Sequence, residues 1–332
     1  MLLSKRERVR RALAHEEVDR LPYSFWRHFP NIDLDPVTLL DETVRFARKL
    51  DLDFVKAMSN GLYCVEDWGA VADYSAIHAG GVARVARHPV VQVDDWRRVQ
   101  CLPTTATALA RELGHLANLV VALGPDVPVL ATVYSPLTIA HKLAGAALDR
   151  DVREAPEAVL NALEAITLTT ADFVQQALAV GCAGVFFAAQ DANPARFNAT
   201  AYARFGEPFD RRVLRAAAPG WFNILHMHGS RVLFDSLKVY PVAALNWHIG
   251  EAPPSVAAYR RAGGRLPIVG GLRRSALTQR NSEAVSTDLL AIKAETAGRG
   301  ILLAPGCVIR EPVDMDFLQR VATQIAHGGA LV

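Results

Sequence analysis

Eight short apolar segments recur along this 332-residue chain, and most of them are followed by a segment with helical periodicity. The segments show no alternation of apolar and polar residues, which is typical of strands buried on both faces of a parallel sheet. They lie at residues 21–26, 53–59, 128–134, 183–189, 221–228, 242–248, 266–271 and 301–306. Eight strand–helix units favour a (β/α)8 barrel. The lack of a GxGxxG motif after the first strand weakens the alternative of a dinucleotide-binding open sheet.

The chain is expected to form one domain over residues 1–332, because no change of composition and no linker divides it. Residues 1–20 predict a charged N-terminal helix without the apolar region of a signal peptide. Residues 60–103 depart from the repeat, since β-branched residues alternate there with Gly and Pro punctuation. The sequence therefore predicts an α/β barrel with an N-terminal helix and a β-rich excursion after its second strand.

Charge and cysteine content exclude several functional classes. The 36 Lys and Arg residues are balanced by 34 Asp and Glu residues, whereas nucleic-acid binding usually needs a basic surface. No uninterrupted apolar run reaches the length of a membrane span. Four scattered cysteines are too few for a disulfide framework and suit a reducing cytoplasm. We therefore expect a cytoplasmic enzyme that acts on a small molecule.

Candidate metal ligands lie at the carboxyl ends of the expected strands, where barrel enzymes carry their chemistry. His226 and His228 are two residues apart on an extended strand, so their side chains point to the same side. Cys307 follows the last strand and opens onto the same mouth. Two imidazoles and a thiolate are a usual Zn²⁺ ligand set, and His248 is a candidate fourth ligand or a support for another ligand. Without a metal, the histidines would bind substrate and Cys307 would be a small buried residue.

Other polar residues at strand ends are candidates for binding and acid–base chemistry. Arg27 and His28, after the first strand, either hold an anionic group such as a carboxylate or form only a charged surface. Tyr134 and Asp191 are candidate catalytic residues, and Asp191 could act as a base, as a partner of a metal ligand or as a turn residue. The further candidates for substrate binding are Gln190 and Asn246.

Several stretches resemble the uroporphyrinogen decarboxylase superfamily, in order and over essentially the whole chain. They are RERVRRALAHEEVDRLPYSFW, YSPLTIAHKLAG, LHMHG, LNWH with the GG that follows, and ILLAPGC. The resemblance implies a (β/α)8 barrel and one of two activities. The superfamily contains porphyrinogen decarboxylases that need no cofactor, and zinc-dependent enzymes that pass methyl groups from corrinoid proteins or folates to thiols.

The departures from the superfamily's patterns favour its methyltransferase branch. The decarboxylases carry two arginines after the first strand, whereas the segment WRHFPNID offers only Arg27. The methyltransferases carry His-x-Cys-Gly and Gly-Cys as zinc ligands; His226, Gly229 and Cys307 match, and His228 replaces the first Cys. A zinc site with one thiolate keeps a net positive charge, which acidifies a bound thiol or water more strongly but makes a bound thiolate a poorer nucleophile.

The resemblance thus implies a Zn-dependent methyltransferase-like enzyme with a small thiol as acceptor. Any corrinoid would belong to a partner protein, because the chain has no Asp-x-His-x-x-Gly attachment motif. Two alternatives stay open, a decarboxylase-like lyase that acts without metal and a non-catalytic corrinoid- or porphyrin-binding protein. The methyl donor, the acceptor and the oligomeric state, including a homodimer, are left open.

Overall fold

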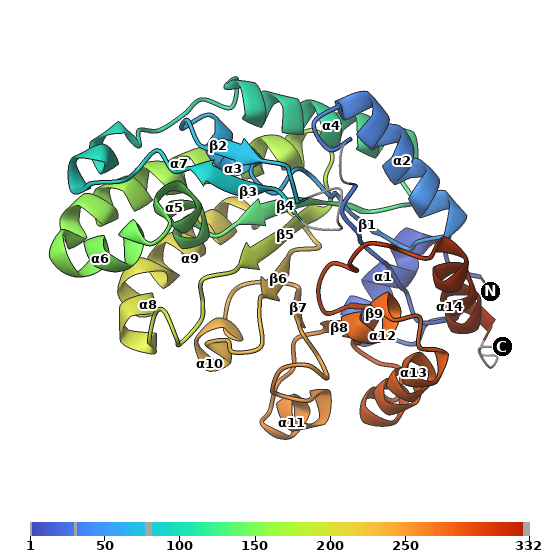
Figure 1. Ribbon diagram of the computed structural model, residues 1–332. Helices are drawn as coiled ribbons and strands as arrows, with labels where there is room; N and C mark the ends of the chain where they lie inside the picture. The colour runs from blue at the N-terminus through green and yellow to red at the C-terminus, as the bar shows by residue number, and fades with distance from the viewer. Residues whose placement is uncertain (1, 30–31, 77–81, 328–332) are drawn as a thin grey trace.

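The computed structural model describes residues 2–29, 32–76 and 82–327, and its central feature is a curled sheet of seven parallel strands (Figure 1). The strands are, in spatial order, β1 (Val55–Lys56), β4 (Val129–Tyr134), β5 (Gly184–Ala189), β6 (Ile224–Met227), β7 (Ala244–Trp247), β8 (Ile268–Leu272) and β9 (Ile301–Pro305). Each strand pairs in parallel with the one that follows it, so the carboxyl ends of all seven lie at one edge.

Residues 21–26, the first expected strand, hydrogen-bond to both ends of this sheet. Tyr23 forms a parallel bridge with Leu303 of β9, and the backbone N–H of Ser24 donates to the Leu303 carbonyl at 3.0 Å. On the other side, the Tyr23 carbonyl accepts the N–H of Asp53, just before β1. The predicted α/β fold with a parallel sheet is confirmed. A complete eight-stranded barrel stays a prediction, because residues 21–26 form one bridge, at Tyr23, and no continuous strand.

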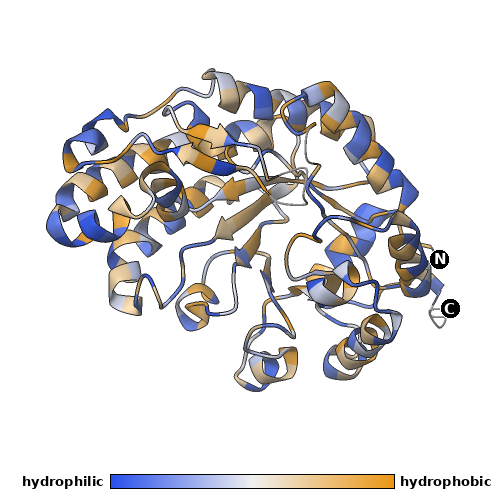
Figure 2. Ribbon diagram, viewed as in Figure 1, coloured by the Kyte–Doolittle hydropathy of each residue, from blue (hydrophilic) through white to orange (hydrophobic). Residues whose placement is uncertain are grey.

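Helices cover the outside of the sheet and present hydrophilic residues outward, while the strands are mostly hydrophobic (Figures 1 and 2). They are α1 (Lys5–Leu13), α2 (Pro36–Lys49), α3 (Tyr63–Glu66), α4 (Thr107–Leu123), α5 (Pro136–Ala144), α6 (Ala147–Glu154), α7 (Pro156–Ala179), α8 (Ala199–Phe205), α9 (Glu207–Ala216), α10 (Phe234–Leu237), α11 (Val256–Arg261), α12 (Arg274–Thr278), α13 (Ser282–Thr296) and α14 (Met315–His327). None of these described helices combines the length and apolar character needed to cross a membrane.

Local sequence signals explain where these helices begin and end. The carboxylate of Asp35 and the hydroxyl of Ser135 each accept a backbone N–H in the first turn of α2 and α5, and both helices begin with proline. Helix α5 ends before Gly145, whose φ of +56° favours glycine, and α6 begins at Ala147. The N-terminal helix is also shorter than the expected residues 1–20, because it begins after Ser4 and ends at Leu13.

The region between β1 and α4, where an excursion at residues 60–103 is predicted, contains elements of both kinds. It contains α3, an antiparallel pair formed by β2 (Val71–Asp73) and β3 (Arg84–Arg87), and a 3-10 helix, η2 (Val93–Arg98). Residues 77–81 lie outside the described part of the chain. The term β-rich therefore fits only the middle of this region, because helical turns precede and follow the two strands.

A buried ionic cluster attaches α1 to the end of the sheet opposite the strands' carboxyl ends. Asp53, just before β1, is fully buried and accepts hydrogen bonds from Arg8 Nη1 at 2.6 Å and Arg20 Nη1 at 2.5 Å. Its Oδ2 also accepts the backbone N–H of Tyr23 at 2.9 Å. These contacts join the N-terminal helix, the segment 21–26 and β1, and so help to hold the ring of strands together.

Candidate metal centre

Four side chains that could bind a metal meet at the carboxyl ends of three strands. His226 lies in β6, His228 comes just after it, His248 follows β7, and Cys307 follows β9. One ligand atom of each side chain lies within 4.8 Å of those of the others. The structure thus brings together all four residues that the sequence nominated as metal ligands.

The closest contacts in this His/Cys cluster match the spacing of ligands around zinc. His226 Nε2 lies 3.3 Å from His228 Nδ1, and Cys307 Sγ lies 3.6 Å from the same nitrogen. With Zn–N bonds of about 2.0–2.1 Å and Zn–S bonds of about 2.3 Å, neighbouring ligand atoms of a tetrahedron are about 3.3–3.8 Å apart. The cluster offers three nitrogens and one sulfur, so its two closest contacts and its donor chemistry fit a zinc ion.

Asn246, the residue that pairs with His226 across β6 and β7, determines which nitrogen of His226 faces the cluster. Asn246 Nδ2 donates to the carbonyls of Val269 at 2.6 Å and Pro305 at 3.3 Å, so Oδ1 is left as the acceptor for His226 Nδ1–H at 2.5 Å. The lone pair of His226 Nε2 then points toward His228. The expected substrate contact of Asn246 stays a prediction, while its observed contacts orient His226.

Burial keeps the three histidines of the cluster neutral. It lowers the pKa of His226 well below the ordinary value and that of His248 to about 4, and the pKa of His228 is also lowered. Burial raises the pKa of the Cys307 thiol, while the backbone N–H of Val308 and the charge of Arg274 oppose this rise. Neutral imidazoles are the form that binds a metal, whereas the thiol would lose its proton on binding.

Three cations near the cluster were not selected from the sequence. Lys56 is the last residue of β1, Lys142 lies in α5, and Arg274 begins α12. The charges of Arg274 and Lys142 contribute to the lowered pKa of His228. Lys56 could have been selected from the sequence, because it stands inside an apolar strand segment and lysine is rarely buried without a partner. The side chains of Lys142 and Arg274 reach the strand ends from helices, so no strand pattern could have found them.

Asp191, a candidate catalytic residue, lies just after β5 in a network of basic side chains. Its Oδ1 lies 3.0 Å from His141 Nδ1 and 3.1 Å from Arg196 Nη1. Arg196 also contacts His141 Nε2 and forms an ion pair with Asp149 at 3.3 Å. His141 lies within α5, so a search of the strand ends does not find it. The role of Asp191 as a base stays a prediction.

Tyr134 and Gln190 lie at the ends of β4 and β5. Tyr134 is buried, which raises the pKa of its hydroxyl well above the ordinary value, and Lys142 Nζ lies 4.7 Å from its ring centroid. The backbone N–H of Gln190 donates to Thr138 Oγ1 at 3.0 Å, and its side chain is half-buried. The expected catalytic role of Tyr134 and the substrate contact of Gln190 stay predictions.

Arg27 and His28 have different surroundings although they are neighbours in sequence. Arg27 forms an ion pair with Glu311, with Nη2 and Oε1 2.7 Å apart, so its charge is already balanced inside the protein. The pKa of His28 is lowered to about 4, first by burial and then by the charges of Lys56 and Lys142. Anion binding by Arg27 and His28 stays a prediction, and the ion pair makes Arg27 the weaker candidate.

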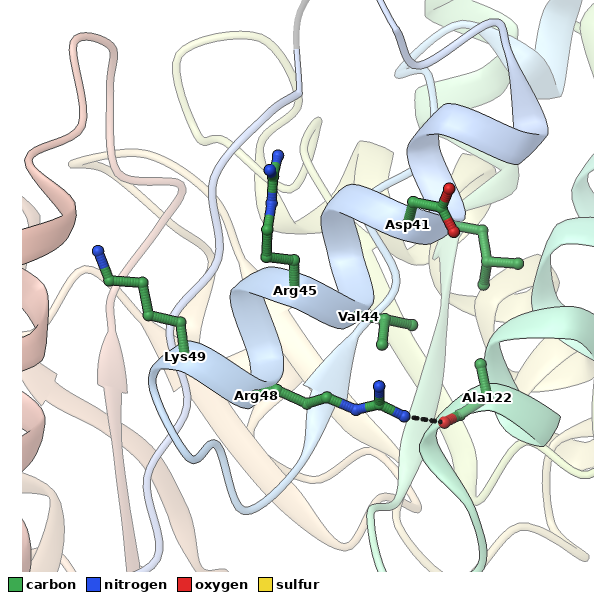
Figure 3. Close-up of a pocket in the computed structure, with 7 residues that line it drawn as sticks. Asp41, Val44, Arg45, Arg48, Lys49 and Ala122 are labelled. Atoms are coloured by element: carbon green, nitrogen blue, oxygen red, sulfur yellow. Dashed lines mark hydrogen bonds between the residues drawn. The ribbon is translucent and has the colours of Figure 1, made fainter.

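A groove of about 590 Å³ lies elsewhere, on the outer surface between α2 and α4 (Figure 3). Arg48 reaches across it and donates to the carbonyl of Ala122 at 3.0 Å. Its lining residues are Leu40, Asp41, Val44, Arg45, Arg48, Lys49 and Ala122. None of these belongs to the His/Cys cluster, so the candidate site rests on the donor chemistry at the strand ends.

Comparison with known proteins gives a family and a fold. A model of the uroporphyrinogen decarboxylase (URO-D) family matches residues 4–326. Comparison with curated proteins finds no significant match. A solved methyltransferase from Methanosarcina mazei is 15% identical with a TM-score of 0.77, over 98% of this chain and 99% of its own. A B12-independent methionine synthase from Shewanella sp. W3-18-1 is 11% identical with a TM-score of 0.50, over 92% and 94% of the two chains. At these identities the two structures establish a shared fold only.

Proposed function

The chain belongs to the uroporphyrinogen decarboxylase family, and from this premise we propose that it is a zinc-dependent methyltransferase-like enzyme that methylates a small thiol. The observation that carries the proposal is the cluster of His226, His228, His248 and Cys307 at the strand ends. A cofactor-free decarboxylase has no need of three neutral imidazoles and a thiol whose ligand atoms lie within 4.8 Å of one another. The fold shared with a methyltransferase is consistent with this choice.

His226, His228 and Cys307 would hold the zinc ion. Bound there, zinc would supply a Lewis acid that lowers the pKa of an acceptor thiol. His248 would be either the fourth ligand or a support, because its Nε2 already accepts the backbone N–H of Gly229 at 3.3 Å. Its Nδ1 lies 3.8 Å from a carboxylate oxygen of Glu251, which would help to hold the ring in place.

The remaining candidate residues would bind the acceptor and handle its proton. Asp191, oriented by His141, would accept the proton released from the thiol. Tyr134, Gln190 and His28 would contact the acceptor from the neighbouring strand ends. Because these side chains come from several different strands, the acceptor would be enclosed at the mouth of the sheet.

The proposal also includes a partner, a location and a closed barrel. The methyl donor would be the corrinoid of a separate protein, and the enzyme would act in the cytoplasm. Residues 21–26 would serve as the eighth barrel strand, which their hydrogen bonds to Leu303 and Asp53 support. A closed ring of strands would hold Cys307 against His226 in β6 and His228 just after it.

Metal analysis of the purified protein tests this proposal directly. Protein made in zinc-supplemented medium without chelators is expected to contain one zinc ion per chain. The variants His226→Ala and Cys307→Ala are expected to lose that zinc, whereas Cys182→Ala, which removes a buried cysteine outside the cluster, should keep it. Folded wild-type protein without stoichiometric zinc would contradict the proposal.

Assays with defined compounds separate the alternatives. Zinc-loaded protein incubated with methylcobalamin and a small thiol is expected to form the methyl thioether, detected by mass spectrometry. Conversion of uroporphyrinogen to coproporphyrinogen that persists in His226→Ala would instead establish the metal-free lyase. Tight corrinoid or porphyrin binding in optical titration, with no product formed, would establish a binding protein.

A further inference from the structure

Lys56 places a buried ammonium group among the strands without a carboxylate partner in the described part of the chain. The residue is 6% exposed and lies at the carboxyl end of β1. Within residues 2–29, 32–76 and 82–327, its Nζ has one hydrogen-bond partner, the sulfur of Met58 at 2.7 Å. The same nitrogen lies 4.9 Å from the centroid of the Phe186 ring. A thioether and a ring face are weak partners for a cation, so they do not offset its loss of water.

This ammonium group is close to the His/Cys cluster. Phe186, whose ring faces Lys56, also stacks on His226 with centroids 5.1 Å apart. The charge of Lys56 contributes to the pKa shifts of His226, His28 and Cys307, which come from three different segments. Lys56 therefore shares a ring neighbour with His226 and lies within electrostatic range of the strand-end side chains.

Lys56 differs in its pairing from the two arginines near the strand ends, Arg27 and Arg196. Arg27 is paired with Glu311 and Arg196 with Asp191, each within 3.1 Å. The acids near the cluster are engaged elsewhere: Asp191 contacts Arg196 and His141, and a carboxylate oxygen of Glu251 lies 3.8 Å from His248 Nδ1 and 3.9 Å from Arg274 Nη2. Burial also lowers the pKa of Lys56 to about 7, which is the direction expected for a cation without a counter-charge.

We propose that Lys56 binds a carboxylate of the acceptor beside His226 and Cys307, and that this contact selects an anionic acceptor. The inference rests on the proposed function for the position of the acceptor. A carboxylate at this point would supply the counter-charge that the protein omits, and hydrogen bonds between two charged groups are about twice as strong as neutral ones. Lys56 would then replace Arg27 as the main anion-binding residue.

Calorimetric binding of matched probes to the zinc-loaded protein tests this inference. The probes are 3-mercaptopropionate and its neutral amide, 3-mercaptopropionamide. We expect the wild type to bind the acid roughly 10- to 100-fold more tightly, the range of a hydrogen bond to a charged group. Lys56→Met is expected to lose this preference, while Lys49→Met, which removes an exposed lysine paired with Asp316, should keep it. Lys56→Gln is a second variant that keeps a polar group if Lys56→Met does not fold.

The oxygen analogues, 3-hydroxypropionate and its amide, distinguish failure of this inference from failure of the proposed function. If zinc binds no thiol, 3-mercaptopropionate and 3-hydroxypropionate will bind with the same affinity. Each acid will still bind more tightly than its amide, and this preference will still depend on Lys56. Equal binding of acid and amide by the wild type, or no binding of any probe, would overturn the role of Lys56. A preference that survives in both Lys56 variants would overturn it as well.

Discussion

The imidazole of His226 and the side-chain amide of Asn246 form one hydrogen-bonded unit, with Nδ1 and Oδ1 2.5 Å apart. The two residues are register partners in neighbouring parallel strands, so the backbone ladder sets their separation. Asn246 is in turn held by the carbonyls of Val269 and Pro305, which lie in β8 and β9. Orientation of the candidate metal ligand on β6 therefore depends on three further strands.

Replacing Asn246 is expected to weaken metal binding without removing a ligand. Asn246→Ala should lower zinc affinity by about 10- to 100-fold, because partners that orient a histidine ligand have effects of this size. Asn246→Asp keeps an acceptor for His226 Nδ1–H and should retain more of the affinity. Chelator competition measures the affinity of both variants, and thermal melts of the metal-free proteins check their folding. Unchanged zinc affinity in Asn246→Ala would show that this hydrogen bond does not matter for the metal.

Gly306 allows β9 to approach the end of β7. A Cβ atom at this position would lie 2.7 Å from His248 Cα and 2.8 Å from the Trp247 carbonyl oxygen, both of which belong to the backbone. Gly306→Ala is therefore expected to displace Cys307 from the histidines and to reduce zinc content, as measured by metal analysis. Gly114→Ala is the matched control, since a Cβ atom on this glycine of α4 would meet no neighbouring atom within 4 Å. This control should gain about 1 kcal/mol in helix stability and keep its zinc.

Loss of Asp53 is expected to destabilise the whole fold. Asp53→Ala leaves the buried guanidinium of Arg8 and that of Arg20 without their shared carboxylate, which typically costs about 3–5 kcal/mol. Chemical denaturation should report this decrease in the free energy of unfolding. Asp316→Ala breaks the exposed pair with Lys49 and is expected to change the same quantity by about 1 kcal/mol at most. Similar effects of the two variants would contradict the structural role of Asp53.

Asp210 is expected to make stability depend on pH. Burial raises its pKa from 3.8 to about 7, although the hydroxyls of Tyr202 and Tyr240 donate to Oδ2 at 2.6 and 3.0 Å and oppose that rise. Between these two pKa values the folded state binds more protons than the unfolded state, so the free energy of unfolding falls as pH rises from about 4 to 7. The steepest slope is about 1.4 kcal/mol per pH unit.

Urea denaturation across this pH range checks the contribution of Asp210. Asp210→Asn has no proton to lose and should show a flatter profile than the wild type, with the two curves converging at low pH. The conservative amide keeps an oxygen that can accept the tyrosine hydroxyls. An identical pH profile for the two proteins would mean that Asp210 does not titrate in this window.

Much of the fold could be predicted because apolar strand segments and helical periodicity are local features of the sequence. The buried strand expected at 128–134 is β4 (Val129–Tyr134), and the one expected at 301–306 is β9 (Ile301–Pro305). The sequence pattern does not show where consecutive helices divide: α8 ends before Gly206, and α9 begins directly after it. A continuous eighth strand at 21–26 was also expected, whereas the segment forms one bridge with β9, between Tyr23 and Leu303.

For the candidate site, the sequence by itself determined which side chains meet. His226 and His228 share one face because side chains alternate along a strand, and Cys307 joins them because parallel strands place their carboxyl ends at one edge. Only the tertiary structure decided what surrounds the polar side chains at the strand ends. Asn246 is the partner of His226, and Glu311 is the partner of Arg27. Lys56 has no carboxylate partner among the described residues. Hydrogen bonds and desolvation depend on distances of a few tenths of an ångström between segments far apart in the chain, and no local pattern carries those distances.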